Sequence, residues 1–207
     1  DDLALWLLLG TAQANDDDLL QAEASFQRAA ACEGKAADWL KLSTEFDRQG
    51  WYKQALHAVE TAWRLDGNAA VALLQRSRCH KALGNAQAAA ADCRRLIAMD
   101  REIGRAWFAL TDLKTVSLSE NELHQLDMAS LRSDLRPEDR VLLDFALGHG
   151  LEEAGEFERA LLAFQRANAA VRITTPWHAS AFAKRVESIQ HAFADVPVAQ
   201  ASPQGGE

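Results

Sequence analysis

The sequence predicts an all-α fold, and three observations lead to this prediction. About a fifth of the 207 residues are alanine, the strongest helix former, while β-branched residues are scarce. The first of the four prolines is Pro137, so no proline interrupts a helix in the first two thirds of the chain. Apolar and small residues recur at helical spacing, and the whole pattern repeats every 33 or 34 residues.

The repeat is clearest when the first two units are aligned. Six positions of the first unit recur 33 residues later, where Trp6, Leu9, Gly10, Ala22, Phe26 and Ala29 are matched by Trp39, Leu42, Ser43, Ala55, Val59 and Ala62. Three further copies follow along the chain. The repeat therefore predicts units at about 3–36, 37–69, 70–103, 104–136 and 137–172.

Each unit is expected to be a pair of antiparallel helices. The apolar spacing predicts helices at 3–14 and 18–31, 36–48 and 52–64, 69–82 and 86–98, 103–115 and 119–131, and 137–153 and 157–171. Glycines at the matching turns, Gly50, Gly84 and Gly155, predict left-handed helix caps. The small residue at Ala55 and its equivalents lets the second helix approach the first closely. Residues 119–136 lack these small-residue positions, so the fourth unit departs from the pattern.

One more helix is predicted at 177–194, after Pro176. Its apolar residues, Phe182, Val186, Ile189 and Phe193, recur at the spacing of one helix face. We expect this helix to cap the fifth unit, so that the array and its cap occupy residues 1–195. Residues 196–207 are rich in Pro and Gly without periodicity and predict a linker or disordered tail.

The motif W-x-x-L-G-x-x-Y followed by A-x-x-x-F-x-x-A, with a period of 34, resembles the tetratricopeptide repeat (TPR) family from about residue 3 to residue 172. The proline that usually ends each unit is replaced here by Gly34 and Gly67. The resemblance implies an α-α superhelix, a TPR solenoid of about five hairpins with a concave and a convex face. It also implies a protein-interaction scaffold without catalytic activity.

Composition excludes several other functions. A net charge of −8 argues against a nucleic-acid platform, and no apolar run is long enough to span a membrane. Cys32, Cys79 and Cys93 form no C-x-x-C pair, which indicates small core residues in a reducing compartment. We therefore expect a cytoplasmic protein without metal, cofactor or catalytic residues. The chain begins on Asp1 rather than on a methionine, so the lack of a signal peptide carries little weight.

The family resemblance also points to candidate binding residues, because the first helix of each TPR unit lines the concave groove. The fifth motif position falls on five large apolar residues: Leu7, Leu40, Leu74, Phe108 and Phe145. Neighbouring groove positions fall on Thr11, Thr44, Arg78, Asp112 and His149, with Asp47, Lys81 and Glu152 one turn further on. We expect an apolar groove for an extended or helical peptide of a protein partner. The alternative is that neighbouring helices, or the closing helix, cover these side chains. A carboxylate clamp is disfavoured, because the places of its Asn and Lys/Arg set hold Thr11, Thr44, Arg78 and Lys81, of which only the last two are basic.

Residues 135–194 resemble a narrower group of TPR-containing proteins. The run from Leu135 to Asn168 is similar to the segment before the catalytic domain in bacterial TPR-sulfotransferase proteins. In that family a G-x-P-R-S-G-T loop for the donor's 5′-phosphate follows, and residues 1–207 contain none. This resemblance implies a second function, the regulatory or substrate-presenting region of a sulfotransferase. The chain's own C-terminal catalytic domain would then be a partner.

Overall fold

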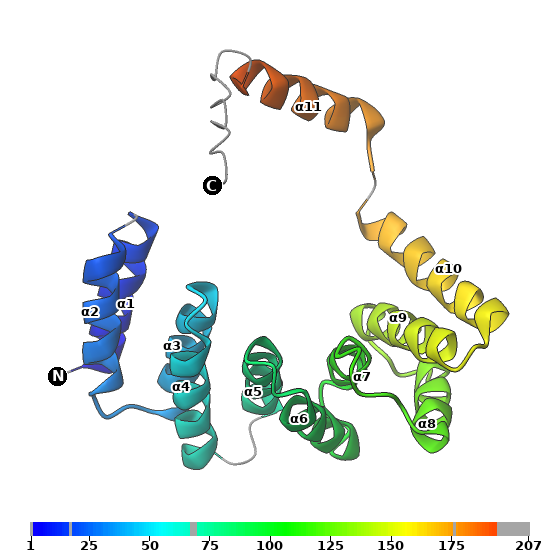
Figure 1. Cartoon of the computed structure of the whole chain (residues 1–207), viewed down its shortest axis with the longest axis horizontal. Helices are drawn as coiled ribbons and strands as arrows, with labels where there is room; N and C mark the ends of the chain where they lie inside the picture. The colour runs from blue at the N-terminus through cyan, green and yellow to red at the C-terminus, as the bar shows by residue number, and fades with distance from the viewer. Residues whose placement is uncertain (1, 17, 67–69, 176, 194–207) are drawn as a thin grey trace, which may run out of the picture. The chain divides into compact units, whose positions relative to one another are not determined.

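The structure is a computed structural model that describes residues 2–16, 18–66, 70–175 and 177–193. Within these ranges the chain forms eleven α-helices and no strand, which confirms the all-α prediction. The helices, shown in Figure 1, are α1 (Leu3–Asn15), α2 (Leu19–Ala30), α3 (Ala36–Arg48), α4 (Tyr52–Leu65), α5 (Ala70–Ala82), α6 (Ala86–Ala98), α7 (Ile103–Thr111), α8 (Glu120–Ser130), α9 (Pro137–Glu153), α10 (Phe157–Thr174) and α11 (Ala179–Phe193).

Ten of the eleven helices end within three residues of their predicted bounds, but α7 does not. The sequence pattern predicts a helix to residue 115, whereas α7 ends at Thr111. The reason is a backbone reversal, because Lys114 has a left-handed φ of 57° and Thr115 donates its N–H to the carbonyl of Leu113 at 2.7 Å. A non-glycine residue in this conformation cannot continue a right-handed helix.

Three helix pairs are closed by the same glycine turn. Gly50, Gly84 and Gly155 have φ values of 76°, 78° and 78°, as their predicted role requires. At each turn the N–H that follows the glycine donates to a carbonyl five residues earlier at 2.8 Å, in the pairs Trp51 to Phe46, Asn85 to His80 and Glu156 to Leu151. This bonding pattern is the Schellman motif, in which a left-handed residue satisfies the last carbonyls of a helix.

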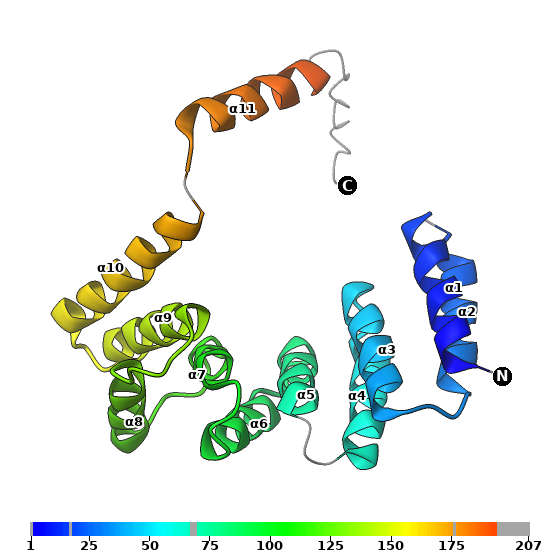
Figure 2. The same cartoon turned by 180° about the vertical axis from the view of Figure 1, so that it is seen from behind.

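The helices of the first part of the chain pack as hairpins in chain order. Helices α1 and α2, α3 and α4, and α5 and α6 lie side by side in both views (Figures 1 and 2). Successive hairpins touch through α4 and α5 and through α6 and α7, and the helices α1, α3, α5 and α7 also contact one another in turn. Each hairpin therefore buries its apolar faces against its neighbours in the sequence.

The fourth unit breaks this pattern. Helix α7 packs against α9, and α8 also packs against α9. At the position where the other second helices carry Ala22, Ala55, Ala89 and Ala160, helix α8 carries Leu123. Gly104 brings α7 close to α9, since a Cβ there would lie 2.7 Å from the Cα of Asp139. The absence of a small residue on α8 and the glycine on α7 explain why α7 has α9 as its packing partner.

The core follows the repeat positions. Ala22, Ala55 and Ala89 are fully buried, and Ala160 is buried as well. The residues four positions after the first three of these alanines, Phe26, Val59 and Cys93, are also fully buried. Alanine therefore serves as the contact residue between the two helices of a hairpin, and the larger side chain fills the space beside it.

The chain divides into two compact units, residues 1–168 and residues 169–207. Helix α11 belongs to the second unit and contains no buried residue. Its predicted apolar stripe is present as a helix face, with Phe182, Ile189 and Phe193 exposed. The predicted role of α11 as a cap for the fifth unit stays a prediction. The predicted tail at 196–207 and Gly67 lie outside the described residues.

Candidate functional site

A cleft of about 750 Å³ opens among α3, α4, α5, α6, α7 and α9. Its apolar wall is formed by Leu74 from α5, Phe108 from α7, Leu113 from the turn after α7 and Leu142 from α9. Leu74 and Phe108 are half-buried, so each presents apolar surface to the cleft while packing on the core. The cleft is large enough to take one or two bulky side chains of a ligand.

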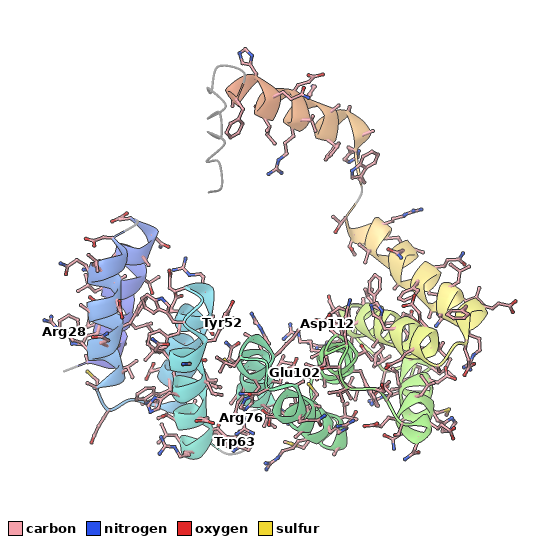
Figure 3. All side chains as sticks on the ribbon, viewed as in Figure 1. Arg28, Tyr52, Trp63, Arg76, Glu102 and Asp112 are labelled. Carbon is pink, nitrogen blue, oxygen red and sulfur yellow. The ribbon has the colours of Figure 1, made fainter. Side chains whose placement is uncertain are left out.

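Two ion pairs lie at the edge of this cleft and connect α3, α5 and α7, the first helices of three successive units. A guanidinium nitrogen of Arg78 on α5 donates to the Asp47 carboxylate on α3 at 2.7 Å. The ammonium group of Lys81 on α5 pairs with the carboxylate of Asp112 at the end of α7. Figure 3 labels Asp112 together with Tyr52, the first residue of α4, and both side chains line the cleft.

The ion pairs at the edge are open to solvent on their cationic side. The side chains of Arg78 and Lys81 are 60% and 47% exposed. Exposed pairs of this kind stabilise a fold by about 1 kcal/mol or less. Both cations can therefore exchange their present partners for a carboxylate of a ligand at small cost.

The floor of the cleft includes Cys93 on α6. Burial raises the pKa of its thiol to about 11, and a hydrogen bond with Ser77 opposes this shift only in part. The group therefore stays a neutral thiol near pH 7, and a neutral thiol is a weak nucleophile. In this cleft Cys93 contributes packing rather than reactivity.

Four of the eight residues predicted from the sequence meet at this cleft. Leu74 and Phe108 supply its apolar wall, and Arg78 and Lys81 supply its edge. All four come from the adjacent first helices of the third and fourth units, α5 and α7. The structure therefore brings together the central part of the predicted set.

The other four predicted residues do not line this cleft. Leu7 is 8% exposed and belongs to the core formed by the first two hairpins, and Leu40 is half-buried against the same core. Phe145 and His149 lie on α9. The imidazole of His149 contacts the Phe164 ring edge to face, with ring centres 5.1 Å apart.

Sequence reasoning missed several residues of the cleft, among them Tyr52, Arg105, Leu113 and Leu142. The prediction considered only the central positions of first helices, whereas Tyr52 begins a second helix. Tyr52 is the single tyrosine of the chain, and this rarity is a sequence signal that could have pointed to it. Leu142 lies three residues before Phe145 on α9, so the same helix face already contained a predicted residue.

Among the described residues, no three side chains of His, Cys, Asp or Glu lie close enough together to hold a metal ion. None of the helices in the described ranges combines the length and apolarity needed to cross a membrane. No protein-family model matches the sequence, and a comparison with curated proteins gives no match. The function is therefore inferred from the repeat and from the cleft.

Proposed function

We propose that this chain is a non-catalytic interaction scaffold of the TPR type, and that the cleft between α5 and α7 binds a peptide or helix of a partner protein. One observation carries the proposal: the half-buried side chains of Leu74 and Phe108 line the same cleft of about 750 Å³, which is edged by exchangeable ion pairs. Binding sites for side chains of a partner combine an apolar pocket with a few polar groups that orient the ligand.

Contacts at the repeat spacing support the TPR assignment. Polar side chains join successive units across separations of 31 to 36 residues, in the pairs Asn15 with Arg48, Asp47 with Arg78, Lys81 with Asp112, Asp100 with Arg132, Asp127 with Arg159 and Ser117 with Glu153. A stack of similar hairpins places residues one period apart next to each other. The recurring Schellman turns support the same assignment.

The chemistry of the cleft supports binding rather than catalysis. Its carboxylates, Asp47 and Asp112, are both paired with cations, Arg78 and Lys81. Its thiol, Cys93, has a pKa raised to about 11. A catalytic base or nucleophile instead needs a pKa close to the working pH.

A test can use the repeat itself as a control. Leu40 and Leu74 occupy the same motif position in neighbouring units, but only Leu74 lines the cleft. Peptides selected from a displayed random library against the full chain should bind the Leu74→Glu variant at least about tenfold more weakly, since the carboxylate would be buried against an apolar ligand. The Leu40→Glu variant should keep the affinity of the wild type.

Circular dichroism melts of both variants would show whether each remains folded at the temperature of the binding assay. Equal affinity of the selected peptides for the wild type and for Leu74→Glu would exclude the cleft as the binding site. Loss of binding in both variants would also contradict the proposal, because it would place the site along α3 as well as α5.

The likeness of residues 135–168 to TPR-sulfotransferase proteins favours a second proposal, in which this array presents substrates to a catalytic domain. In the structure these residues form α9 and most of α10, and the Asn168 amide donates to the carbonyl of Phe164 at 2.8 Å. The test is the coding sequence that follows residue 207. A strand and a G-x-P-R-S-G-T loop there would support this second proposal, and a stop codon would exclude it.

A further inference from the structure

Helix α1 has two apolar faces, although only one of them packs on the core. Leu3, Leu7, Gly10 and Ala14 form the buried face. Leu5, Leu8, Leu9 and Ala12 form a second face, which is exposed. The side chains of Leu5 and Leu8 are 64% and 67% accessible to solvent. A contiguous exposed apolar face of this kind is typical of a surface that contacts another protein element.

The later first helices show what this second face does elsewhere in the chain. On α3 the repeat aligns the exposed face of α1 with Asp38, Lys41, Leu42 and Glu45, a mostly polar set in which only Leu42 is buried. On the next three first helices it aligns this face with Ala72, Gln75, Arg76 and Cys79, then Ala106, Ala109, Leu110 and Leu113, then Leu143, Ala146, Leu147 and Gly150. All but Arg76 and Ala109 are buried. These residues lie under helices of the preceding unit, since α5 packs on α4, α7 on α6, and α9 on α7 and α8. Where this face is apolar, as on α5, α7 and α9, a neighbouring helix covers it, and the face of α1 is equally apolar but exposed.

The charges around this face limit what can cover it. Helix α1 contains no charged residue, but Asp2 precedes it and Asp16 follows it, and both are exposed. Asp16 is seven residues after Leu9 and so continues the line of the exposed face. A second copy of α1 would bring these acids together in either orientation, which is unfavourable. The complementary helix therefore needs an apolar stripe with a basic residue beside it.

Helix α11 has these properties. Phe182, Val186, Ile189 and Phe193 form its apolar stripe, and no residue of this helix is buried. Arg185 lies directly beside the stripe, one residue before Val186 and four before Ile189. We propose that α11 of a second copy of this chain docks on the exposed face of α1, with Arg185 close to one of the acids that end that face.

This contact joins two different surfaces of the same chain. If each copy receives the α11 helix of the other, the assembly closes as a dimer, and otherwise it grows head to tail. In both cases the association depends on protein concentration and weakens at high salt, because an Arg–Asp attraction at an exposed edge is screened.

The test is sedimentation equilibrium of full-length variants at several concentrations. The double variants Leu5→Glu with Leu8→Glu on α1, and Phe182→Glu with Ile189→Glu on α11, should each weaken self-association at least about tenfold, since each buries carboxylates in an apolar contact. The matched control is Met128→Glu with Leu131→Glu, which alters two equally exposed apolar residues at the end of α8. The control should associate as the wild type does.

Mixing the two double variants distinguishes this contact from nonspecific self-association. The α1 variant keeps an intact α11, and the α11 variant keeps an intact α1, so the mixture should form a one-to-one complex that neither variant forms alone. Circular dichroism of each variant checks that the fold is retained, and the mixing result does so directly, since both partners must be folded to pair.

Three results would overturn the proposal. The first is a wild type that stays monomeric at all concentrations. This includes a monomer in which α11 is protected from proteolysis because it docks within its own chain. The second is self-association that survives the α1 substitutions. The third is a mixture of the two variants that remains monomeric while the wild type associates.

Discussion

The contact between Gly148 on α9 and Phe164 on α10 allows a quantitative test of how the hairpins are packed. A Cβ at Gly148 would lie 2.5 Å from Cε1 and 2.6 Å from Cδ1 of the Phe164 ring, whereas carbon atoms in contact are normally about 3.5–4.0 Å apart. The ring is held by the core beneath it and by the imidazole of His149. A Gly148→Ala substitution would therefore push the ring by about 1 Å against packed neighbours.

The expected cost follows from two opposing terms. Overpacking costs about 1–3 kcal/mol, and replacing glycine by alanine within a helix returns about 1 kcal/mol. Gly148→Ala should therefore destabilise the protein by about 0–2 kcal/mol, with a midpoint of about 1 kcal/mol. Phe164→Val removes a half-buried ring and should cost about 2 kcal/mol by itself. In the double variant the clash is gone and the helix gain remains, so the total should be about 1 kcal/mol and the coupling about 2 kcal/mol.

The same pair recurs in the repeat with its sizes balanced. Gly10 faces Phe26 with a Cβ distance of 2.7 Å, and these residues are 16 apart, as are Gly148 and Phe164. In the two other pairs at these positions, serine replaces glycine and a smaller residue replaces phenylalanine. These pairs are Ser43 with Val59 and Ser77 with Cys93. The chain therefore contains the compensated combination that the double variant is designed to imitate.

The assay is urea unfolding followed by far-UV circular dichroism, with Gly150→Ala as the matched control on the same helix. A Cβ at Gly150 would meet the ends of two flexible leucine side chains, the Cδ1 atoms of Leu123 at 3.0 Å and of Leu118 at 3.2 Å. The helix gain of about 1 kcal/mol is offset only in part by moving these side-chain ends, so this control should be no less stable than the wild type. Additive effects of Gly148→Ala and Phe164→Val within about 0.5 kcal/mol would refute the packing explanation.

Three further substitutions test the core and its ion pairs by the same unfolding assay. Ala55→Leu should cost about 1–3 kcal/mol, because Ala55 is fully buried where α4 meets α3, and unchanged stability would contradict the close approach. Asp92→Ala should cost about 3 kcal/mol, because Asp92 is buried and accepts a hydrogen bond from the Arg76 guanidinium at 2.8 Å. Its loss leaves a largely buried cation without its carboxylate. A cost below about 1 kcal/mol would show that water solvates Arg76 in the variant. The hydrogen bond from Arg94 lowers the pKa of Glu122 from 4.5 to about 2, so its contribution is complete above pH 4.5 and is lost as the pH falls toward 2. Between pH 5 and pH 2 the wild type should therefore lose about 1 kcal/mol more than Glu122→Gln, which keeps the helix cap, and parallel pH curves for the two proteins would contradict this.

The positions of the helices could be predicted from the sequence because each has several independent signals. Apolar spacing, glycine at the turns and alanine at the contact position agree in the first three units, and the structure follows them within two residues. The early end of α7 had no such signal, since a left-handed backbone at Lys114 depends on how the following segment packs rather than on its composition.

Ion pairs that involve a buried carboxylate could not be predicted from the repeat pattern. Arg76 stands where the motif has leucine, and Asp144 stands where it has tryptophan. The structure pairs Arg76 with Asp92, and Asp144 with Arg166 at 2.6 Å. A charged residue at a core position is tolerated only when another element supplies its partner. Asp92 lies 16 residues after Arg76, and Arg166 lies 22 residues after Asp144. Neither partner is a residue that the motif specifies, so the repeat does not predict these pairs.

The candidate site lies where the repeat is irregular, and this has a physical cause. In a regular unit, α7 would be covered by its own second helix. Leu123 on α8 prevents that close approach, and α7 packs on α9 instead. As a result Leu142 of α9 reaches the cleft beside Phe108, and it completes a wall that the regular repeat would not contain. A periodic motif predicts which residues are equivalent, but their exposure depends on which helix lies next to each one. For this reason Leu74 and Phe108 share an open cleft, whereas Leu7, at the same motif position, is enclosed in the core.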